Sequence, residues 1–576
     1  MLVKHEFSAD VIPDRDDATP DDLSPFLKIE RDQRLYSVEF HPDYPATPEV
    51  FICIKCKNWP DFGAGNRIFR YQVKTENGRP FADTNTRELV IEWHTDGHDG
   101  CDMRFGPDGM LYFCSGDGQK PADPANTGQH TDDLLGSIIR IDVSEAPYTV
   151  PADNPFVGID GVRPEVWAYG YRNPWRMHFD EHGHLWVGDN GEDLWEMLHR
   201  VQAGDNAGWS AFEGGRPYRP HNLGGPVKTI APAAITHSHT EAQSIIGGRQ
   251  YRGSRYPELS GRIVYGDFVT GKLWSFLTDK DGTVHDLQRW ADVPSFPSFG
   301  EDSDGELFVV GTKGMVYRIV KHQTSGETLP FPEKLSDTGL FEDTATHLVA
   351  AGLHRYDVAI PQWRDGAQGE RYFGIPANSE RPPLFRGGDG VLVYPEGGVA
   401  MITLTKNEKR IETQLIFKDK REFFFYTYAW NDEQTDARLI GGEGEAVTLA
   451  DGTPWRYMSR AECSTCHTAQ TGFLSGFNFR QLSGCSTNPV DKWMTDKLLL
   501  GWGNVHAPEP YPEWNGTPPK DPAQLAKVAR GYLDTNCASC HREGGAAGRA
   551  DFLLLSKLAL EETGMVGVTP RLNISG

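Results

Sequence analysis

The chain has 576 residues, of which 57 are Lys or Arg and 81 are Asp or Glu, so its formal net charge is −24. A negative field of this size disfavours binding to nucleic acids and to anionic membrane surfaces. No apolar run approaches the roughly 20 residues that a membrane-spanning helix needs. The length predicts several domains, and the mixture of 38% hydrophobic and 24% charged residues is typical of globular proteins.

The first 322 residues contain a recurring pattern, in which an aromatic residue is followed by a turn with Asp or Gly and then by a strand of alternating apolar residues. The copies are VEFHPDYPATPEVFICI (38–54), MRFGPDGMLYFCSG (103–116), MHFDEHGHLWVGDNG (177–191), IVYGDFVTGKLWSF (263–276) and PSFGEDSDGELFVVGTKG (297–314). Because the copies lack helical periodicity, they favour the blades of a β-propeller. An array of β-sandwiches is the alternative.

The pattern stops near residue 322, and two further regions are expected. The segments 410–417 (RIETQLIF) and 421–430 (REFFFYTYAW) predict paired strands in a β-rich domain over 323–455. The segment 522–536 (PAQLAKVARGYLDTN) predicts a helix within an α-helical domain over 456–576. The predicted fold is therefore mainly β, with a propeller domain over 1–322 at its start.

Two C-x-x-C-H boxes occur in the last region, CSTCH and CASCH. This motif is the attachment site of c-type haem, in which two thioethers fix the porphyrin and the histidine ligates the iron. The expected thioether residues are Cys463, Cys466, Cys537 and Cys540, and the expected iron ligands are His467 and His541. With these boxes, the α-helical domain over 456–576 resembles a c-type cytochrome. A four-cysteine zinc site is the alternative. Met494 and Met565 are the downstream candidates for distal ligands.

Haem c is attached outside the bacterial cytosol, so a periplasmic or extracellular location is expected. The first residues, MLVKHEFSAD, lack the apolar core of a signal peptide, and we expect the true amino terminus to lie upstream. The remaining cysteines are Cys53, Cys56, Cys101, Cys114 and Cys485. An oxidising compartment permits a disulfide among them, although the sequence does not give its pairing.

Five longer strings in the propeller region are more specific than a generic blade. They are DGHDGCDMRFGPDGMLYFCSGDGQ (96–119), GSIIRIDV with PADNPFVG (136–158), RPEVWAYGYRNPWRMHFD (163–180), LWVGDNGEDLWEMLHRVQAGDNAGW (185–209) and GGRQYRGSRYPELSGRIVYGDF (247–268). Together they resemble the soluble glucose/sorbosone dehydrogenases that depend on pyrroloquinoline quinone, also called aldose sugar dehydrogenases. The resemblance covers about residues 35–319 and implies a six-bladed propeller, here with an incomplete first blade.

The resemblance also implies roles for four residues. His98 stands at the position of the family's catalytic base, and a neutral histidine is suited to take the proton of a sugar hydroxyl near pH 7. Asp117 matches the acid that orients this base. Arg172 and Asn173 match the pair that contacts the quinone oxygens, where arginine stabilises developing negative charge. Each residue also has a structural interpretation, as a turn, core or loop-capping residue.

Further residues are implied for the cofactor and its calcium ion. The family's calcium is held partly by backbone carbonyls of a loop that aligns with Gly191 and Glu192, although Glu192 replaces the family's proline. The acidic loop around them is also compatible with a solvated turn. The candidates for binding the carboxylates of the quinone are His237, His239, Arg249 and Lys272.

These features predict a quinohaemoprotein that oxidises an aldose or related alcohol and passes electrons to c-type haem and then to a downstream acceptor protein. A tethered haem raises the effective concentration of the electron acceptor. The first alternative is a non-catalytic propeller that binds a partner or glycan and is attached to an electron-transfer cytochrome. The second is a structural zinc protein.

Overall fold

The computed structural model describes residues 7–11, 26–118, 123–192, 194–239, 241–290, 293, 295–312, 315–321, 332–376, 384–386, 391–419, 422–442, 444–468, 471–487, 490–499, 508–542 and 552–566. The chain divides into two compact units, residues 2–328 and 329–576. Each unit is described here by itself.

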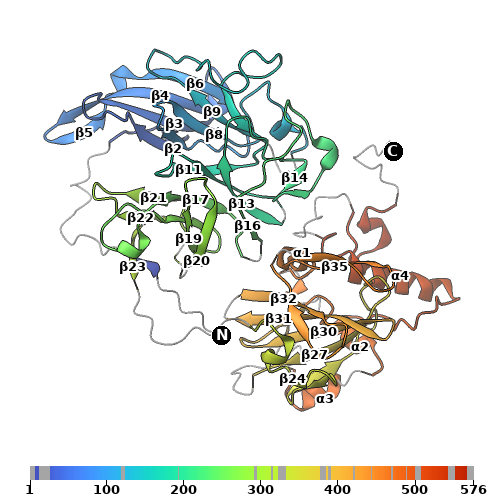
Figure 1. The fold of residues 1–576 in the computed structure, drawn as a ribbon. Coiled ribbons are helices and arrows are strands. Elements are labelled where there is room, and N and C mark those ends of the chain that lie inside the picture. The colour runs from blue at the N-terminus through green and yellow to red at the C-terminus, as the bar shows by residue number, and fades with distance from the viewer. Residues whose placement is uncertain are drawn as a thin grey trace. The chain divides into compact units, whose positions relative to one another are not determined.

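Five larger antiparallel sheets and one two-stranded sheet form in the described part of the first unit. Figure 1 draws this unit in blue to green, and the five larger sheets are described first. Each contains four or five strands, and each of the first four is built from one continuous stretch of chain. The first sheet contains β2 (Gln33–Phe40), β3 (Glu49–Trp59), β4 (Gly63–Glu76), β5 (Arg79–Ala82) and β6 (Glu88–His94), and the second sheet contains β7 (Met103–Phe105), β8 (Leu111–Ser115), β9 (Ser137–Ile141) and β10 (Val166–Tyr169). The third sheet contains β11 (Pro174–Phe179), β12 (Leu185–Asp189), β13 (Trp195–Val201) and β16 (Ile235–Ser238), and the fourth sheet contains β17 (Ile245–Gln250), β18 (Ile263–Asp267), β19 (Leu273–Thr278) and β20 (Val284–Arg289). The fifth sheet contains β21 (Ser298–Glu301), β22 (Leu307–Val310), β23 (Val316–Lys321) and β1 (Phe7–Val11).

The last sheet takes a strand from the other end of the unit. The amino-terminal strand β1 pairs antiparallel with β23, which joins residues 7–11 to residues 317–321. A short hairpin of β14 (Phe212–Glu213) and β15 (Arg216–Pro217) forms a separate two-stranded sheet and lies between β13 and β16 along the chain. The predicted turn-and-strand repeats are therefore confirmed as separate sheets, and five such sheets occur in the described residues. The predicted count of six blades stays a prediction.

Successive sheets stack face to face, as propeller blades do. The first strands of neighbouring sheets contact one another, β2 with β7, β7 with β11, β11 with β17, and β17 with β21. Alternation decides which neighbour each side chain meets. Phe113 packs in the cluster between the first and second sheets, whereas Tyr112 and Cys114, one position away on β8, pack against Met177 and Val187 of the third.

Two buried links connect the first sheets. A disulfide joins Cys53 of β3 to Cys101, just before β7, which answers the pairing that the sequence left open. The carboxylate of Asp102, only 2% exposed, accepts hydrogen bonds from the Ser37 hydroxyl (3.0 Å) and from the backbone amide of Met177 (2.9 Å). Asp102 therefore ties the start of β7 to β2 and β11.

The second unit is built on one antiparallel sheet of strands that differ in length (Figure 1). Its order is β26 (Leu353–Tyr356), β27 (Gln368–Gly374), β30 (Val399–Lys406), β31 (Lys409–Asp419), β32 (Glu422–Trp430) and β33 (Ala437–Leu439). The pairing of β31 with β32 confirms the strand pair predicted from the sequence. Three two-stranded sheets accompany it: β24 (Phe341–Asp343) with β25 (Leu348–Val349), β28 (Leu384–Arg386) with β29 (Val391–Val393), and β34 (Glu445–Thr448) with β35 (Pro454–Tyr457).

The described residues of this unit also form four α-helices, α1 (Arg460–Cys466), α2 (Phe479–Gly484), α3 (Val490–Thr495) and α4 (Pro522–Asn536). Helix α4 spans the predicted segment, with Pro522 in its first turn and the Asp521 side chain accepting the amide hydrogen of Gln524. Helix α1 begins with a capping box, in which the side chains of Ser459 and Glu462 each accept the backbone amide hydrogen of the other residue.

The helices and the sheet share one core. Tyr356 and Phe373 of the sheet pack with Phe477 and with Trp493 of α3 in a single buried cluster. The sequence predicted separate domains over 323–455 and 456–576, whereas the structure groups residues 329–576 into one compact unit. The difference arises because each region supplies only one wall of this core, which local sequence patterns do not reveal.

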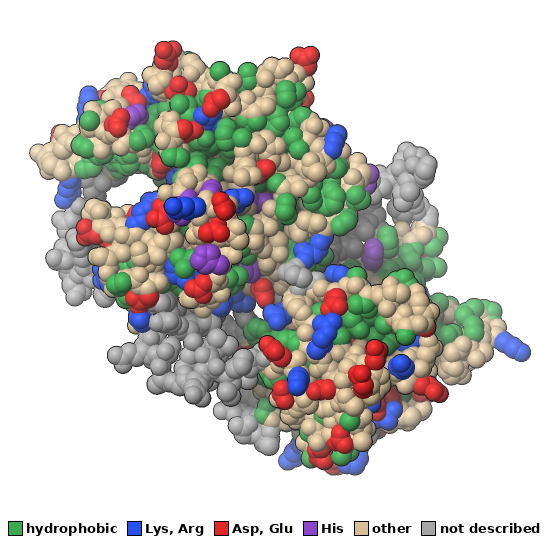
Figure 2. Space-filling view, in the orientation of Figure 1, with side chains coloured by type: hydrophobic (Ala, Val, Ile, Leu, Met, Phe, Trp, Pro, Cys, Tyr) green, Lys and Arg blue, Asp and Glu red, His purple; other side chains and the backbone are tan. Residues whose placement is uncertain are grey.

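The surface of the protein carries both signs of charge. On the face drawn in Figure 2, acidic and basic side chains are interspersed over both units. Among the described helices, none is long and apolar enough to cross a membrane.

Buried histidines predict a fall in stability in acid. Burial lowers the pKa of His199, on β13, from 6.5 to about 4. The unfolded chain therefore binds an extra proton between these values, so the stabilisation present above pH 6.5 is lost as the pH falls towards 4. We expect the free energy of unfolding of the parent to fall more steeply than that of His199→Gln between about pH 7 and 4.5, by up to about 1.4 kcal/mol per pH unit. Urea unfolding at several pH values measures this.

The matched control is His285→Gln, because His285 lies on β20 with an exposed side chain. It should follow the parent at every pH. Equal slopes for the parent and His199→Gln would contradict the prediction.

Candidate functional site

His98 and Asp117 meet at the ends of neighbouring strands. His98 lies in the loop between β6 and β7, and Asp117 follows β8. The ring Nδ1 of His98 is 2.8 Å from Asp117 Oδ1, and the Asp117 carboxylate is fully buried while the His98 side chain is 20% exposed. Gly116 permits this approach, because a Cβ there would lie 2.5 Å from the carbonyl oxygen of His98. The predicted base and its orienting acid are therefore in direct contact.

Trp209 completes the surroundings of this carboxylate. Its indole Nε1 donates a hydrogen bond to Asp117 Oδ2 at 2.8 Å, so both carboxylate oxygens have donors. The amide of Asp117 donates to the carbonyl oxygen of Arg172 at 2.8 Å. The Arg172 guanidinium lies over the Trp209 ring, 5.6 Å from its centroid. The structure thus brings His98, Asp117 and Arg172 together through a residue that the sequence analysis did not single out.

The sequence did contain a pointer to Trp209, because this residue ends the string 185–209 that resembles the family. Its role was missed because nothing local distinguishes an indole that donates to a buried carboxylate from one that fills a core.

The Arg172 side chain is held by the next loop. Its Nε donates to Glu192 Oε2 at 2.9 Å, its Nη2 contacts the same oxygen, and its Nη1 donates to the carbonyl oxygen of Asn190 at 3.2 Å. Both side chains are largely buried, with 10% of Arg172 and 2% of Glu192 exposed. Neighbouring Asn173 donates to Asn190 Oδ1 at 3.1 Å, while its own Oδ1 is buried without a hydrogen-bond partner among the described residues.

Asp189, at the end of β12, positions the backbone of this pair. Its carboxylate accepts from the amide of Asn173 at 2.7 Å and from the amide of Arg172 at 3.2 Å. Burial raises the pKa of Asp189 to about 7.

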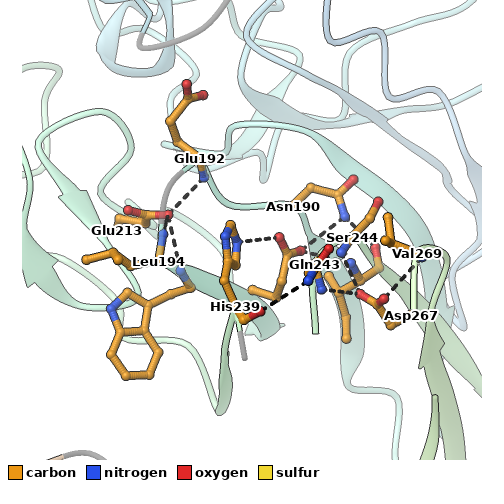
Figure 3. Close-up of polar contacts among 12 residues, drawn as sticks. Asn190, Glu192, Leu194, Glu213, His239, Gln243, Ser244, Asp267 and Val269 are labelled. Carbon is orange, nitrogen blue, oxygen red and sulfur yellow. Dashed lines mark hydrogen bonds and ion pairs between the residues drawn. The ribbon is translucent and has the colours of Figure 1, made fainter. Parts of the chain in front are cut away.

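A second buried carboxylate holds the loop that contains Gly191 and Glu192. Glu213 Oε1 accepts the amide hydrogens of Glu192 (2.8 Å), Leu194 (3.1 Å) and Trp195 (3.3 Å) (Figure 3). Gly191 is required by this packing, because a Cβ there would lie 1.6 Å from the carbonyl oxygen of Trp195. Figure 3 shows the Glu192 side chain directed away from Glu213.

The predicted calcium position stays a prediction. No group of three or more His, Cys, Asp or Glu side chains is arranged to hold a metal ion in the part of the chain that the structure describes. The carbonyl oxygens of Gly191 and Glu192 are a different kind of ligand, and the loop that carries them is ordered by Glu213.

The four residues predicted to bind the carboxylates of the quinone differ in their contacts. Arg249 lies on β17, 3.5 Å from Glu301 of β21, and burial together with nearby Arg104 lowers its pKa to about 10. His237 contacts the Tyr265 hydroxyl at 2.7 Å. His239 Nε2 lies 2.9 Å from Glu196 (Figure 3 labels His239). Lys272, just before β19, is 5% exposed. All four are therefore at least partly buried cationic or ionisable groups.

The first C-x-x-C-H box lies on α1 and at its carboxyl end. Cys463 and Cys466 belong to the helix, and His467 is its C-cap residue. His467 Nδ1 lies 3.1 Å from the carbonyl oxygen of Phe473 and 3.2 Å from the amide nitrogen of Ser475, so both contacts orient the ring through Nδ1. Burial lowers the pKa of His467 to about 4. His467 and Cys463 line a cavity with Tyr356, Phe425 and other residues of the sheet.

The second box follows α4. Cys537 is the C-cap of that helix, and His541 stacks on Phe552 with ring centroids 4.3 Å apart. His541 Nδ1 is buried, and no described residue forms a hydrogen bond with it. Cys540 Sγ lies 3.5 Å from the carbonyl oxygen of Thr465, within the first box, so the two boxes touch.

The methionines named as distal candidates differ in burial. Met494, on α3, packs in the cluster that contains Trp493. Met565 is 38% exposed.

The propeller region is similar in sequence to known proteins. The family model for glucose/sorbosone dehydrogenase matches residues 16–318. HIPL1 protein of Arabidopsis thaliana is 28% identical over 403 residues, covering 54% of this chain and 57% of that protein. Hedgehog-interacting protein of Mus musculus is 26% identical over 323 residues, covering 50% and 43%. Aldose sugar dehydrogenase YliI of Escherichia coli is 27% identical over 242 residues, covering 38% and 61%.

The chain spans 43–61% of the length of these three relatives. The family match covers more than half of the chain and includes every residue of the His98–Asp117–Trp209–Arg172 arrangement. The chain therefore belongs to the glucose/sorbosone dehydrogenase family.

Proposed function

We propose that the protein is an oxidoreductase that oxidises the hydroxyl of an aldose or related alcohol with pyrroloquinoline quinone, and that passes the electrons to c-type haem in its second unit and then to a downstream redox partner. The six-bladed form of the family fold is part of this proposal. The observation that carries it is the contact of His98 Nδ1 with the buried Asp117 carboxylate, which is held in turn by Trp209.

This contact decides the proton chemistry of His98. The hydrogen on Nδ1 is donated to the Asp117 carboxylate, so in the neutral ring Nε2 carries the lone pair. Nε2 is the atom that takes the proton of a substrate hydroxyl, and Asp117 stabilises the charged imidazole that results. Trp209 keeps the carboxylate in place by donating to its second oxygen.

Two residues next to Asp117 fit an anionic quinone in part, because Arg172 is a cation with little exposure and Asn173 Oδ1 is buried without a partner among the described residues. Arg249 and Lys272 are further cations of low exposure, and their place in the quinone site is part of the proposal. Arg172 and Asn173 would hold the quinone oxygens. When bound, pyrroloquinoline quinone would supply the two-electron acceptor for the hydrogen on the alcohol carbon. The backbone carbonyl oxygens of Gly191 and Glu192 would hold a calcium ion in the proposed site.

Haem is proposed for both boxes, with thioethers to Cys463, Cys466, Cys537 and Cys540. His467 fits as an iron ligand because contacts of its Nδ1 with Phe473 and Ser475 orient the ring. The contact of Cys540 with Thr465 supports neighbouring haem sites within this unit. When attached, haem would supply one-electron carriers. The Cys53–Cys101 disulfide and the boxes together support a periplasmic or extracellular location.

A non-catalytic binding module is the second candidate for the first unit. The observation that favours it is the ion pair of Arg172 with Glu192, which engages the guanidinium with a carboxylate of the protein itself.

Substitutions of His98 and Asp117 test the catalytic proposal. We expect His98→Ala to retain quinone binding and to lower the rate of dye-linked sugar oxidation by about 10²–10⁴-fold, because a general base contributes that much. Asp117→Asn should cost less, since it orients the base without taking the proton. The assay uses protein reconstituted with the quinone and calcium, and a panel of aldoses and alcohols identifies the substrate class.

The control is Glu258→Gln, which removes a surface carboxylate that pairs with Lys321. Sugar oxidation by His98→Ala at the parent rate would exclude His98 from the mechanism. Quinone binding without oxidation of any tested alcohol by the parent would favour the binding module.

Haem attachment is tested on the full chain exported together with haem-attachment machinery. Mass spectrometry should find one haem on the peptide of each box, and the protein should show a Soret band. The double substitution Cys463→Ala with Cys466→Ala should remove the haem of the first box and leave that of the second, because each pair of thioethers acts on its own porphyrin. Unmodified peptides at both boxes, with zinc in the purified protein, would refute the haem proposal.

A further inference from the structure

The Arg172 guanidinium is already paired with an anion of the protein itself. Glu192 Oε2 accepts from Arg172 Nε at 2.9 Å and contacts Nη2, while the carbonyl oxygen of Asn190 accepts from Nη1 at 3.2 Å. All three nitrogens of the guanidinium therefore have acceptors. The pair is shielded from water, with 10% of the Arg172 side chain and 2% of the Glu192 side chain exposed. A shielded pair of this kind is screened little by salt.

The loop geometry directs Glu192 to this position. Glu213 holds the backbone amides of Glu192, Leu194 and Trp195, and the close packing of Gly191 on Trp195 fixes the preceding residue. With the backbone fixed on one side, the Glu192 side chain extends away from Glu213 (Figure 3). Because the anchor is on the backbone, the carboxylate itself can exchange its position while the loop stays in place.

The pairing has a consequence for any ligand of Arg172. These contacts use three of the five N–H groups of the guanidinium, so a ligand oxygen that bonds to either of the other two comes to lie close to the Glu192 carboxylate. Two anions do not share one guanidinium in a site of low exposure without repulsion. The Glu192 carboxylate therefore opposes the binding of a second anion at Arg172.

We infer that Glu192 is a built-in carboxylate competitor for the anion site of Arg172, and that it weakens the binding of the anionic quinone there. The inference rests on the proposed function for the identity of the ligand, although the competition itself rests on the contacts of Arg172. Glu192 is in this sense an affinity-determining residue of the site.

The test compares quinone binding by apo forms of the full chain. Equilibrium dialysis with pyrroloquinoline quinone and calcium gives the Kd of the parent, Glu192→Gln, Glu192→Ala and the control Glu258→Gln. Removing the competing charge should lower the Kd of both Glu192 variants at least about tenfold, which corresponds to about 1.4 kcal/mol. The control should bind like the parent. Equal or weaker binding by the Glu192 variants would overturn the inference.

A second probe separates this inference from the proposed function. Oxalate, a small dianion, should raise the thermal midpoint of Glu192→Ala and leave that of the parent unchanged. If no form binds the quinone but oxalate still discriminates, the proposed cofactor is wrong and the competitor role of Glu192 stands. If oxalate does not discriminate in that case, both fail. If both Glu192 variants unfold, the carboxylate is structural and the inference is overturned.

Discussion

Buried carboxylates that accept backbone amide hydrogens are the constraint on which the first unit depends. Loops between blades turn sharply, and each turn leaves amides that have no strand partner. Glu213 accepts three such amides, and Asp189 accepts two beside the site. Asp267 accepts the amides of Gln243 and Ser244, and Glu306 accepts those of Ser254 and Arg255. Buried carboxylates thus accept backbone amide hydrogens at several places in the unit. Some of the acidic residues behind the negative net charge therefore lie in the interior.

This device explains how loops far apart in sequence build one site. Asp117 and His98 come from one pair of loops, and Arg172 and Glu192 from another, yet each loop is fixed by contacts within the protein. A fixed pair of His98 and Asp117 suits the proton transfer that we propose, because reorientation during a reaction costs energy. The same rigidity places the Glu192 carboxylate on Arg172. The contact of His98 with Asp117 and the contact of Arg172 with Glu192 are therefore two results of one architecture.

The second unit follows a different principle, in which helices and a sheet close one core. Phe373 of β27 meets Trp493 of α3, and Gln481 of α2 accepts from the amide of Ile360 through its side-chain oxygen. Around this core the two C-x-x-C-H boxes lie in contact through Cys540 and Thr465. These two residues are 75 positions apart in the sequence, and only the shared core brings them side by side.

The sequence by itself determined the elements whose information is local. Alternating apolar residues predicted the strands of the blades and of β31 and β32, and the segment 522–536 predicted the helix α4. Family-specific strings identified His98, Asp117 and Arg172. The tertiary structure alone decided what depends on contacts between distant segments: the pairing of Cys53 with Cys101, the indole of Trp209 on Asp117, and the carboxylate of Glu192 on Arg172. Periodicity records which face of a strand is buried, whereas the partner of a buried polar group is set by where the loops converge, and that is a property of the assembled sheets.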